Sequence, residues 1–170
     1  EDDVTTYLEY PGGATGVFVT TTGDAHGTNR FEVQMEKARI IVTYDGLSLL
    51  EYDVSEPQWS STNKEPFASM PAQEVKVETD GKNPQHIGVL NAWAGAILRG
   101  EPMVADGREG INGLTLSNAM HLSHFLGQKV TLPLDEDLYE AELMKRVATS
   151  RRKTNVREVV ADTRGTYGKI

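Results

Sequence analysis

The sequence predicts an α+β domain, in which helices pack on one face of an open, largely antiparallel β-sheet. Three observations support this fold class. Residues 1–54 contain short segments of alternating apolar and polar residues, separated by turn residues. Residues 83–127 carry apolar residues at helical spacing, in two runs that glycines close. A third helical run follows residue 135.

The first half of the chain is a series of predicted strands. Alternation begins in residues 4–10, and the Pro-Gly-Gly sequence at 11–13 ends it in a turn. The Asp45-Gly46 dipeptide is typical of a two-residue hairpin. Such short links favour antiparallel pairing of successive strands. Further strands are predicted at residues 14–22, 30–35, 38–44, 47–54 and 73–79.

Residues 55–72 are predicted to form a long loop rich in serine and proline. A helix should follow, because Asn83 is a favourable N-cap and Pro84 suits the first helical position. Glycine is the residue that most often ends a helix, so we expect this helix to close at Gly100.

Asp106 and Glu109 resemble a capping box, which predicts the start of a second helix that Gly127 ends. A short strand is predicted at residues 129–132, and Asp135 is expected to cap a last helix. From residue 151 to 170 the pattern fades into an arm or tail.

Composition excludes several classes of protein. The 170 residues carry a formal net charge of -8, which argues against a general binder of nucleic acid or of anionic membranes. The longest mostly apolar run, residues 87–98, is too short to cross a bilayer. The chain has no cysteine, which fits a reducing compartment, so we expect a cytoplasmic protein.

Polar side chains gather where a loop meets the third predicted strand. Four of them lie within seven positions: Asp24, His26, Asn29 and Arg30. They could bind hydroxyl or carboxylate groups, but turn chemistry, in which Asp and Asn bond local backbone amides, is the simpler interpretation. We keep His26 and Arg30 as candidate substrate contacts. We add His86, which lies in the first turn of a predicted helix, where local hydrogen bonding is the alternative.

Other polar motifs favour structural roles. His121 and His124 are three residues apart on a predicted helix, but no third ligand stands at helical spacing, so we predict packing and no metal site. A basic run could be a phosphate-binding or acid-binding patch, but cations at a helix C-terminus are the favoured interpretation. Its members are Lys145, Arg146, Arg151, Arg152 and Lys153.

No nucleotide-binding motif is visible either. The glycine-rich residues 12–16 precede a predicted strand and open no helix, which is not the context of a dinucleotide fingerprint.

Three ordered stretches carry a family resemblance. The first is EDDVTTYLEYPGGATGVFVTTTGDAHGTNRFEV, at residues 1–33. The second is HIGVLNAWAGAILRGEPMVADGREGINGLTLSNAMHLSHFLGQKVTLPLD, at residues 86–135, and the third is the helix from Leu138 to Ser150. Together they resemble the C-terminal half of the glucose–fructose oxidoreductase/inositol dehydrogenase (Gfo/Idh/MocA) family.

The resemblance implies a division of labour. Members are NAD(P)-dependent oxidoreductases of sugars, cyclitols and related polyols. Each joins an N-terminal Rossmann domain to a C-terminal α/β domain, whose open sheet lines the substrate site and commonly mediates oligomers. Residues 1–150 would be this substrate and oligomerisation domain, followed by the arm at 151–170. The Rossmann domain of the parent enzyme would be a partner outside this chain.

The family's nucleotide fingerprint, its catalytic lysine motif and its D-x-G-x-H segment all precede the matched region. The resemblance therefore implies no catalytic residue and no cofactor contact here. NAD or NADP would bind in the parent enzyme, and this chain by itself would be inactive.

A non-enzymatic module is the alternative, acting in self-association or in carbohydrate binding. A sugar site would need exposed aromatic side chains beside paired polar groups, whereas self-association would bury a large apolar contact. Of the two tryptophans, Trp93 is predicted on a helix surface. Trp59 is the more plausible stacking platform for a sugar, although a loop anchor is the simpler interpretation.

Overall fold

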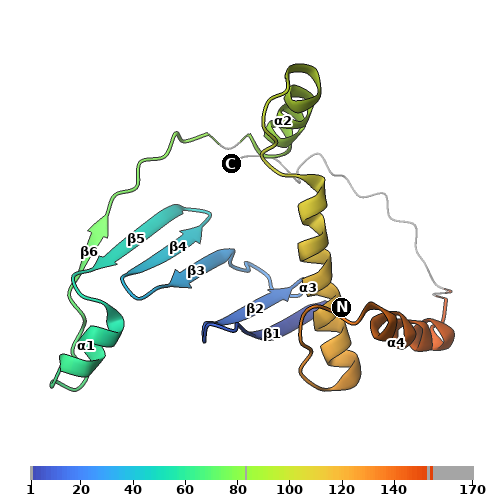
Figure 1. The fold of residues 1–170 in the computed structure, drawn as a ribbon, viewed down its shortest axis with the longest axis horizontal. Helices are drawn as coiled ribbons and strands as arrows, with labels where there is room; N and C mark the ends of the chain where they lie inside the picture. Colours follow the sequence, from blue (N-terminus) through green and yellow to red (C-terminus); the bar gives the residue numbers. More distant parts are fainter. Residues whose placement is uncertain (1, 83, 153, 155–170) are drawn as a thin grey trace. The chain divides into compact units, whose positions relative to one another are not determined.

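A computed structural model describes residues 2–82, 84–152 and 154 of the chain (Figure 1). The described chain forms two compact units, one from Glu1 to Val104 and one from Ala105 onward. All six strands and the first two helices belong to the first unit, and the last two helices belong to the second.

Antiparallel pairing organises every strand of the first unit. β1 (Asp3–Glu9) pairs with β2 (Thr15–Thr21) as a two-stranded sheet. A four-stranded sheet has the order β3-β4-β5-β6. The α+β class and the antiparallel pairing are thus confirmed, with the strands divided between two sheets. The bounds of the second sheet's strands are β3 (Arg30–Gln34), β4 (Ala38–Thr43), β5 (Gly46–Tyr52) and β6 (Ala72–Val75).

The β4–β5 hairpin confirms the prediction made from the Asp45-Gly46 dipeptide. Thr43 lies opposite Gly46, so Tyr44 and Asp45 form a two-residue loop. Gly46 has a φ of 142°, a conformation open to almost no other residue. The Thr43 hydroxyl accepts a hydrogen bond from the Asp45 backbone N–H at 3.2 Å, which closes the turn.

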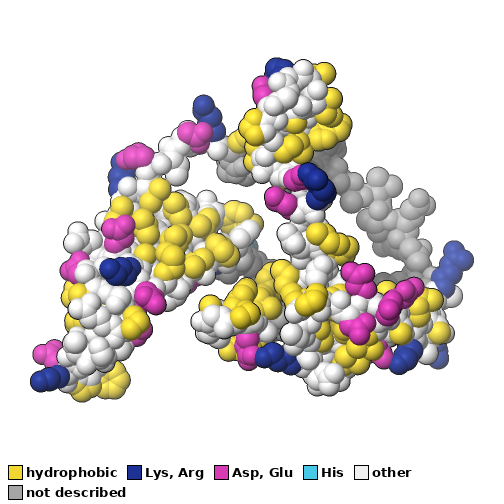
Figure 2. All heavy atoms as spheres, in the orientation of Figure 1, with side chains coloured by type: hydrophobic (Ala, Val, Ile, Leu, Met, Phe, Trp, Pro, Cys, Tyr) yellow, Lys and Arg dark blue, Asp and Glu magenta, His cyan; other side chains and the backbone are white. Residues whose placement is uncertain are grey.

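Register gives the four-stranded sheet two different faces, because residues directly opposite each other point to the same side. We call one the apolar face; it carries Phe31, Val33, Ile40, Val42, Leu47, Leu49 and Val75, and its end row adds Ala38, Glu51 and Gln73. The other, which we call the polar face, carries Arg30, Glu32, Gln34, Arg39, Ser48, Tyr52 and Glu74, together with Ile41, Thr43, Leu50 and Ala72. Figure 2 shows hydrophobic side chains gathered over this sheet.

The long loop predicted at residues 55–72 contains a helix, so that part of the prediction is wrong. α1 (Glu56–Thr62) has a proline in its first turn and follows Ser55 at the N-cap position. The Ser60 hydroxyl donates to the Glu56 carboxylate at 2.5 Å, one turn away. The prediction missed this helix because its serine-rich sequence has low helix propensity. The Glu56 N–H donates to the Glu36 carbonyl at 2.7 Å, which connects the start of the helix to the turn between β3 and β4.

α2 (Gln85–Arg99) begins one residue later than predicted. Pro84 stands at the N-cap position, while Asn83, the predicted cap, lies outside the described residues. Gly100 ends the helix as predicted, with a left-handed φ of 69° and its N–H bonded to the Ala96 carbonyl at 3.2 Å. Trp93 lies on the surface of α2, as expected, with 55% of its side chain exposed.

Two helical glycines should respond in opposite ways to alanine. A Cβ on Gly88, in the first turn of α2, would lie 2.7 Å from Cγ of Pro84, whose ring cannot move aside easily. A Cβ on Gly113, in the other unit, would meet nothing within 4 Å. We therefore expect Gly113→Ala to stabilise its helix by about 0.5–1 kcal/mol and Gly88→Ala to give no gain or a loss. Thermal unfolding followed by circular dichroism measures both, and equal stabilisation would contradict the Pro84 contact.

The second unit holds two helices and a short 3₁₀ turn. These are η1 (Gly107–Glu109), α3 (Gly110–Leu126) and α4 (Glu136–Thr149). Asp106 does not form the predicted capping box with Glu109; its carboxylate accepts from the Arg108 N–H at 2.9 Å and caps η1 instead. Gly127 ends α3 with a φ of 63°, and the Asp135 carboxylate accepts from the Leu138 N–H at 2.9 Å, so both of these predictions are confirmed.

The strand predicted at residues 129–132 is absent from the structure; these residues form an irregular link between α3 and α4. A short apolar alternation forms a strand only where a neighbouring strand offers backbone hydrogen bonds, and no described strand pairs with it.

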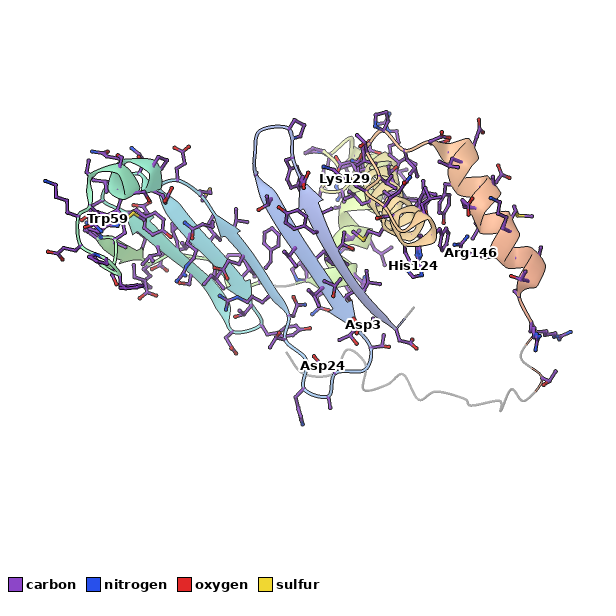
Figure 3. The ribbon with its side chains drawn as sticks, turned by 90° about the horizontal axis from the view of Figure 1, so that it is seen from below. Asp3, Asp24, Trp59, His124, Lys129 and Arg146 are labelled. Carbon is purple, nitrogen blue, oxygen red and sulfur yellow. The ribbon has the colours of Figure 1, made fainter. Side chains whose placement is uncertain are left out.

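Leu122 on α3 is the one fully buried large apolar side chain in the described ranges, at 1% exposure. Phe125, three residues further along α3, joins α3 to α4 through an aromatic and ionic cluster. Figure 3 labels Arg146 of this cluster on α4. The Tyr139 ring stacks on Phe125 with centroids 6.4 Å apart, and the Arg146 guanidinium carbon lies 3.6 Å from the Phe125 centroid. Arg146 also donates to the Phe125 carbonyl at 3.2 Å and to the Glu142 carboxylate at 3.2 Å.

Acid should weaken this helix pair. The hydrogen bond from Lys145 lowers the pKa of Glu142, partial burial opposes the shift, and Arg146 adds to the lowering. A carboxyl whose pKa is depressed in the folded state stabilises it above the unfolded pKa and loses that contribution as pH falls. We therefore expect Glu142→Gln to be less stable than wild type at pH 7. The difference should close as pH falls below about 4.3 in urea titrations at several pH values. A difference that is constant with pH would contradict the ion pairs.

Candidate functional site

Residues paired across neighbouring strands form four rows on the polar face, and three of these rows contain a charged side chain. Arg30, the first residue of β3, donates through Nε and Nη2 to one Glu32 carboxylate oxygen, at 3.0 and 2.6 Å. Arg39 of β4 approaches the other oxygen of Glu32, with its Nε at 3.9 Å. This distance is too long for a hydrogen bond, so Glu32 is held mainly by Arg30.

A neutral pair lies beside these charges. The Gln34 amide donates to the Tyr52 hydroxyl at 2.9 Å, and the same hydroxyl lies 3.0 Å from the Gln34 carbonyl oxygen, toward which it can donate. Gln34 also donates to the Met35 carbonyl at 3.0 Å. Gln34 lies opposite Arg39, so β3, β4 and β5 each place one member of the set on the same face.

Arg39 is left incompletely satisfied. Its Nε is buried and has no hydrogen-bond partner, and the Arg39 guanidinium makes no hydrogen bond to any part of the chain that the structure describes. Its side chain is 41% exposed, so solvent or a ligand reaches its outer part. The group of Arg30, Glu32 and Arg39 by itself carries a charge of about +1, counted as two arginines and one glutamate, and Glu74 of β6 lies in the same cross-strand row as Arg39, two strands away.

The sequence did not single out Arg39, Gln34 or Tyr52. Arg39 and Gln34 each stand between apolar residues, Tyr52 stands between Glu51 and Asp53, and no local motif marks any of the three. The alternation of β3 does predict part of the set, because residues 30, 32 and 34 are alternate residues of one strand and therefore point to the same side of the sheet. Only the strand register shows which residues of β4 and β5 join them.

The predicted substrate contacts lie on three separate parts of the first unit. His26 is exposed in the loop between β2 and β3, with a positive φ of 61°. Arg30 belongs to the polar face, where it is engaged with Glu32. His86 is exposed in the first turn of α2. Their roles in binding a substrate remain predictions.

In the same loop, Asn29 makes a hydrogen bond that differs from the expected turn chemistry. The Asn29 amide donates to the Tyr44 hydroxyl at 3.2 Å, across the end of β3 and β4, rather than to its own backbone. Tyr44 is 80% exposed at the hairpin tip, and Asp24 lies in the loop (Figure 3).

The two α3 histidines belong to the Phe125 cluster. The ring centroids of His121 and His124 lie 5.9 and 6.1 Å from that of Phe125. No group of three or more His, Asp or Glu side chains in the described ranges is placed so that it could hold a metal ion. Of the basic run, Lys145 and Arg146 pair with Glu142, Arg151 and Arg152 follow the helix, and Lys153 lies outside the described residues.

Much of the apolar face is uncovered. Phe31 is 64% exposed, and Val42 and Leu47 are each 40% exposed, although the three are paired in one row across β3, β4 and β5. Contiguous apolar surface of this kind is a common mark of a protein interface. Among the described helices, none is long and apolar enough to cross a membrane.

Comparison with known families agrees with the architecture. Residues 1–132 match the family model described as the C-terminal alpha/beta domain of an oxidoreductase family, the Gfo/Idh/MocA family. No curated protein gives a significant match. The family match spans more than three quarters of the 170 residues and includes both sheets, α1, α2 and α3. The chain therefore belongs to the Gfo/Idh/MocA oxidoreductase family and corresponds to the C-terminal α/β domain of that family.

Proposed function

We propose that this chain is the substrate and assembly domain of an NAD(P)-dependent oxidoreductase acting on a sugar, a cyclitol or a related polyol. The carrying observation is the difference between the two faces of the four-stranded sheet. One face is apolar and exposed, as an interface requires, and the other presents charged and hydroxyl groups, as a polyol site requires. Residues 1–150 would make up the domain.

The apolar face would meet a second copy of the chain. An exposed row of Phe31, Val42 and Leu47 gains free energy when a similar row covers it. A twofold arrangement sets the same surface against itself. Glu51 is the one charged residue that the described strands place on this face, and it lies two rows away from Phe31, Val42 and Leu47. The -8 charge of the chain makes contact through its charged surfaces less favourable.

The polar face and the loop at residues 23–29 would form one wall of the substrate site. His26, Arg30 and His86 remain candidates for hydrogen bonds to hydroxyl groups. A Rossmann domain would be the partner that binds NAD or NADP and brings the nicotinamide to the substrate, because the described residues hold no recognisable nucleotide site. The domain's contribution would be binding and positioning of the polyol, and the hydride would pass between nicotinamide and substrate carbon.

A carbohydrate-binding module without catalysis is the second candidate. The favouring observation is Tyr44, an aromatic ring that is 80% exposed and whose hydroxyl accepts a hydrogen bond from Asn29. Sugars stack on such rings while polar neighbours bond their hydroxyls. Tyr44→Ala would then abolish binding to immobilised polysaccharide, whereas the oxidoreductase proposal expects no such binding in the first place.

The self-association of the chain tests the proposal. Sedimentation of the 170-residue chain should show a dimer or larger assembly at micromolar concentration. Phe31→Asp on the apolar face should weaken the dimer at least about tenfold, because each copy would bury an unpaired carboxylate. Ser48→Asp is the matched control, because it adds the same charge to the polar face of the same sheet.

Because Phe31 is already 64% exposed in the single chain, its replacement should leave the far-ultraviolet circular dichroism unchanged. A strictly monomeric wild-type chain would count against the interface, as would equal effects of the two aspartates. A separate titration with NADH should show no binding to this chain alone.

A further inference from the structure

We propose that Arg39, together with Gln34 and Tyr52, recognises a carboxylate group on a sugar-like ligand at the polar face of the four-stranded sheet. The inference rests on the proposed function in taking the polar face as the ligand-facing wall. It goes beyond that function by naming the ligand's charged group and the residues that read it. A sugar acid, such as a uronate, is the chemical class that combines polyol hydroxyls with one carboxylate.

The first step in the argument is that Arg39 has donors to spare. It contacts Glu32 only at 3.9 Å, and it donates no hydrogen bond within the described part of the chain. Arg30 already donates twice to Glu32, so Glu32 does not neutralise Arg39 as well. A guanidinium has five N–H donors. Those on the exposed outer nitrogens of Arg39 are open to water in the free chain, and a ligand carboxylate can replace that water.

The second step is the charge of the ligand group that would bind Arg39. The three ionised groups that contact one another, Arg30, Arg39 and Glu32, carry a charge of about +1, which one carboxylate bound to Arg39 would neutralise. A phosphate carries about -1.5 to -2 at neutral pH and would leave negative charge next to Glu32, in a chain of net charge -8. A planar guanidinium also matches a carboxylate by two parallel hydrogen bonds from its outer nitrogens.

The third step is the rigidity and polarity of the surroundings. Arg39, Gln34 and Tyr52 come from three adjacent strands, so the sheet fixes their backbone positions. The Gln34 amide and Tyr52 hydroxyl bond each other at 2.9 and 3.0 Å, which holds both side chains beside Arg39. The Tyr52 hydroxyl keeps one further lone pair, suited to a ligand hydroxyl next to the carboxylate.

The test is a titration of the full 170-residue chain with D-glucuronate, followed by calorimetry and by the Arg Nε–Hε signals in NMR. We expect saturable binding that moves one Nε–Hε signal, which Arg39→Gln identifies by its loss. Arg39→Gln should weaken glucuronate binding about tenfold, because a charge-assisted pair is removed. D-glucose lacks the carboxylate. Its affinity for wild type should therefore be no higher than the affinity of glucuronate for Arg39→Gln.

Arg108→Gln is the matched control, since Arg108, in the other unit, also lies beside a carboxylate and donates to Asp106 through both Nε and Nη2. It should leave glucuronate binding unchanged. Arg39→Lys keeps the charge and loses the planar fork, so it should bind with intermediate affinity and guards against a loss caused by misfolding.

Several results would overturn the site. Equal binding by wild type and Arg39→Gln would remove Arg39 from it, and acetate or phosphate binding as tightly as glucuronate would reduce it to a simple anion site. If Arg39→Gln disrupted the dimer while no sugar acid bound, Arg39 would be an interface residue instead. Failure of the proposed function would give a different result: Phe31→Asp would sediment like wild type.

Discussion

Replacing Leu122 with alanine should lower the stability of the α3–α4 unit by about 2–5 kcal/mol, the range for removing a fully buried leucine side chain. Leu122 is 1% exposed, and no other large apolar side chain in the described ranges is as completely enclosed. The loss should therefore exceed that of any other single leucine truncation in this unit. Amide hydrogen exchange along α3 and α4 measures it directly.

Both tryptophans, Trp59 and Trp93, belong to the other unit, so tryptophan fluorescence serves as an internal control. We expect α3 amide protection to fall in Leu122→Ala while the urea midpoint of tryptophan fluorescence stays unchanged. Leu116→Ala, also on α3 but 40% exposed, should cost much less. Similar losses for the two leucines would contradict a core centred on Leu122.

Replacing Phe125 with alanine should cost about 2–4 kcal/mol, close to the range for a buried phenylalanine but reduced by its partial exposure. The ring stacks on Tyr139 and supports the Arg146 guanidinium at 3.6 Å. Its removal would leave Arg146 with its bonds to the Glu142 carboxylate and the residue-125 carbonyl but without a ring beneath it. Urea unfolding followed at 222 nm reports the loss.

A double-mutant cycle separates the ring from the cation. Arg146→Met keeps the length of the side chain and removes its charge, so the coupling free energy between positions 125 and 146 should be about 0.5–2 kcal/mol. The control pair is Phe125→Ala with Arg99→Met. Arg99 lies on α2, in the other unit, where it pairs with Glu101. Coupling near zero for both pairs would show that the cation contributes nothing through the ring.

The strands and helix ends were predictable because their causes are local. The Asp45-Gly46 hairpin, the glycines at 100 and 127 and the Asp135 cap each depend on a few neighbouring residues, and the structure confirms them. The errors arose where propensity misled or where a distant partner decided the outcome. α1 is a helix despite its serines, and residues 129–132 are no strand, although their sequence alternates.

The candidate site was less predictable for the same reason. Arg30 was found because it sits in a dense polar loop, whereas Arg39 is surrounded in sequence by apolar residues of β4. Its position beside Gln34 and near Glu32 follows from the pairing of β3 with β4, a contact that no single segment encodes. Side-chain alternation identified the two faces but could not say which polar residues meet.

The pairing register of β3 makes the turn at residues 35–37 intolerant of a change in length. Shifting β3 by one residue against β4 would move Arg30, Glu32 and Gln34 to the side now occupied by Phe31 and Val33. Charges would then stand in the surface proposed to meet a second copy, and an apolar side chain, Val33 or Met35, would replace Gln34 opposite Arg39. An insertion of one residue there would thus disable assembly and ligand recognition together, while substitutions in the same turn could leave both intact.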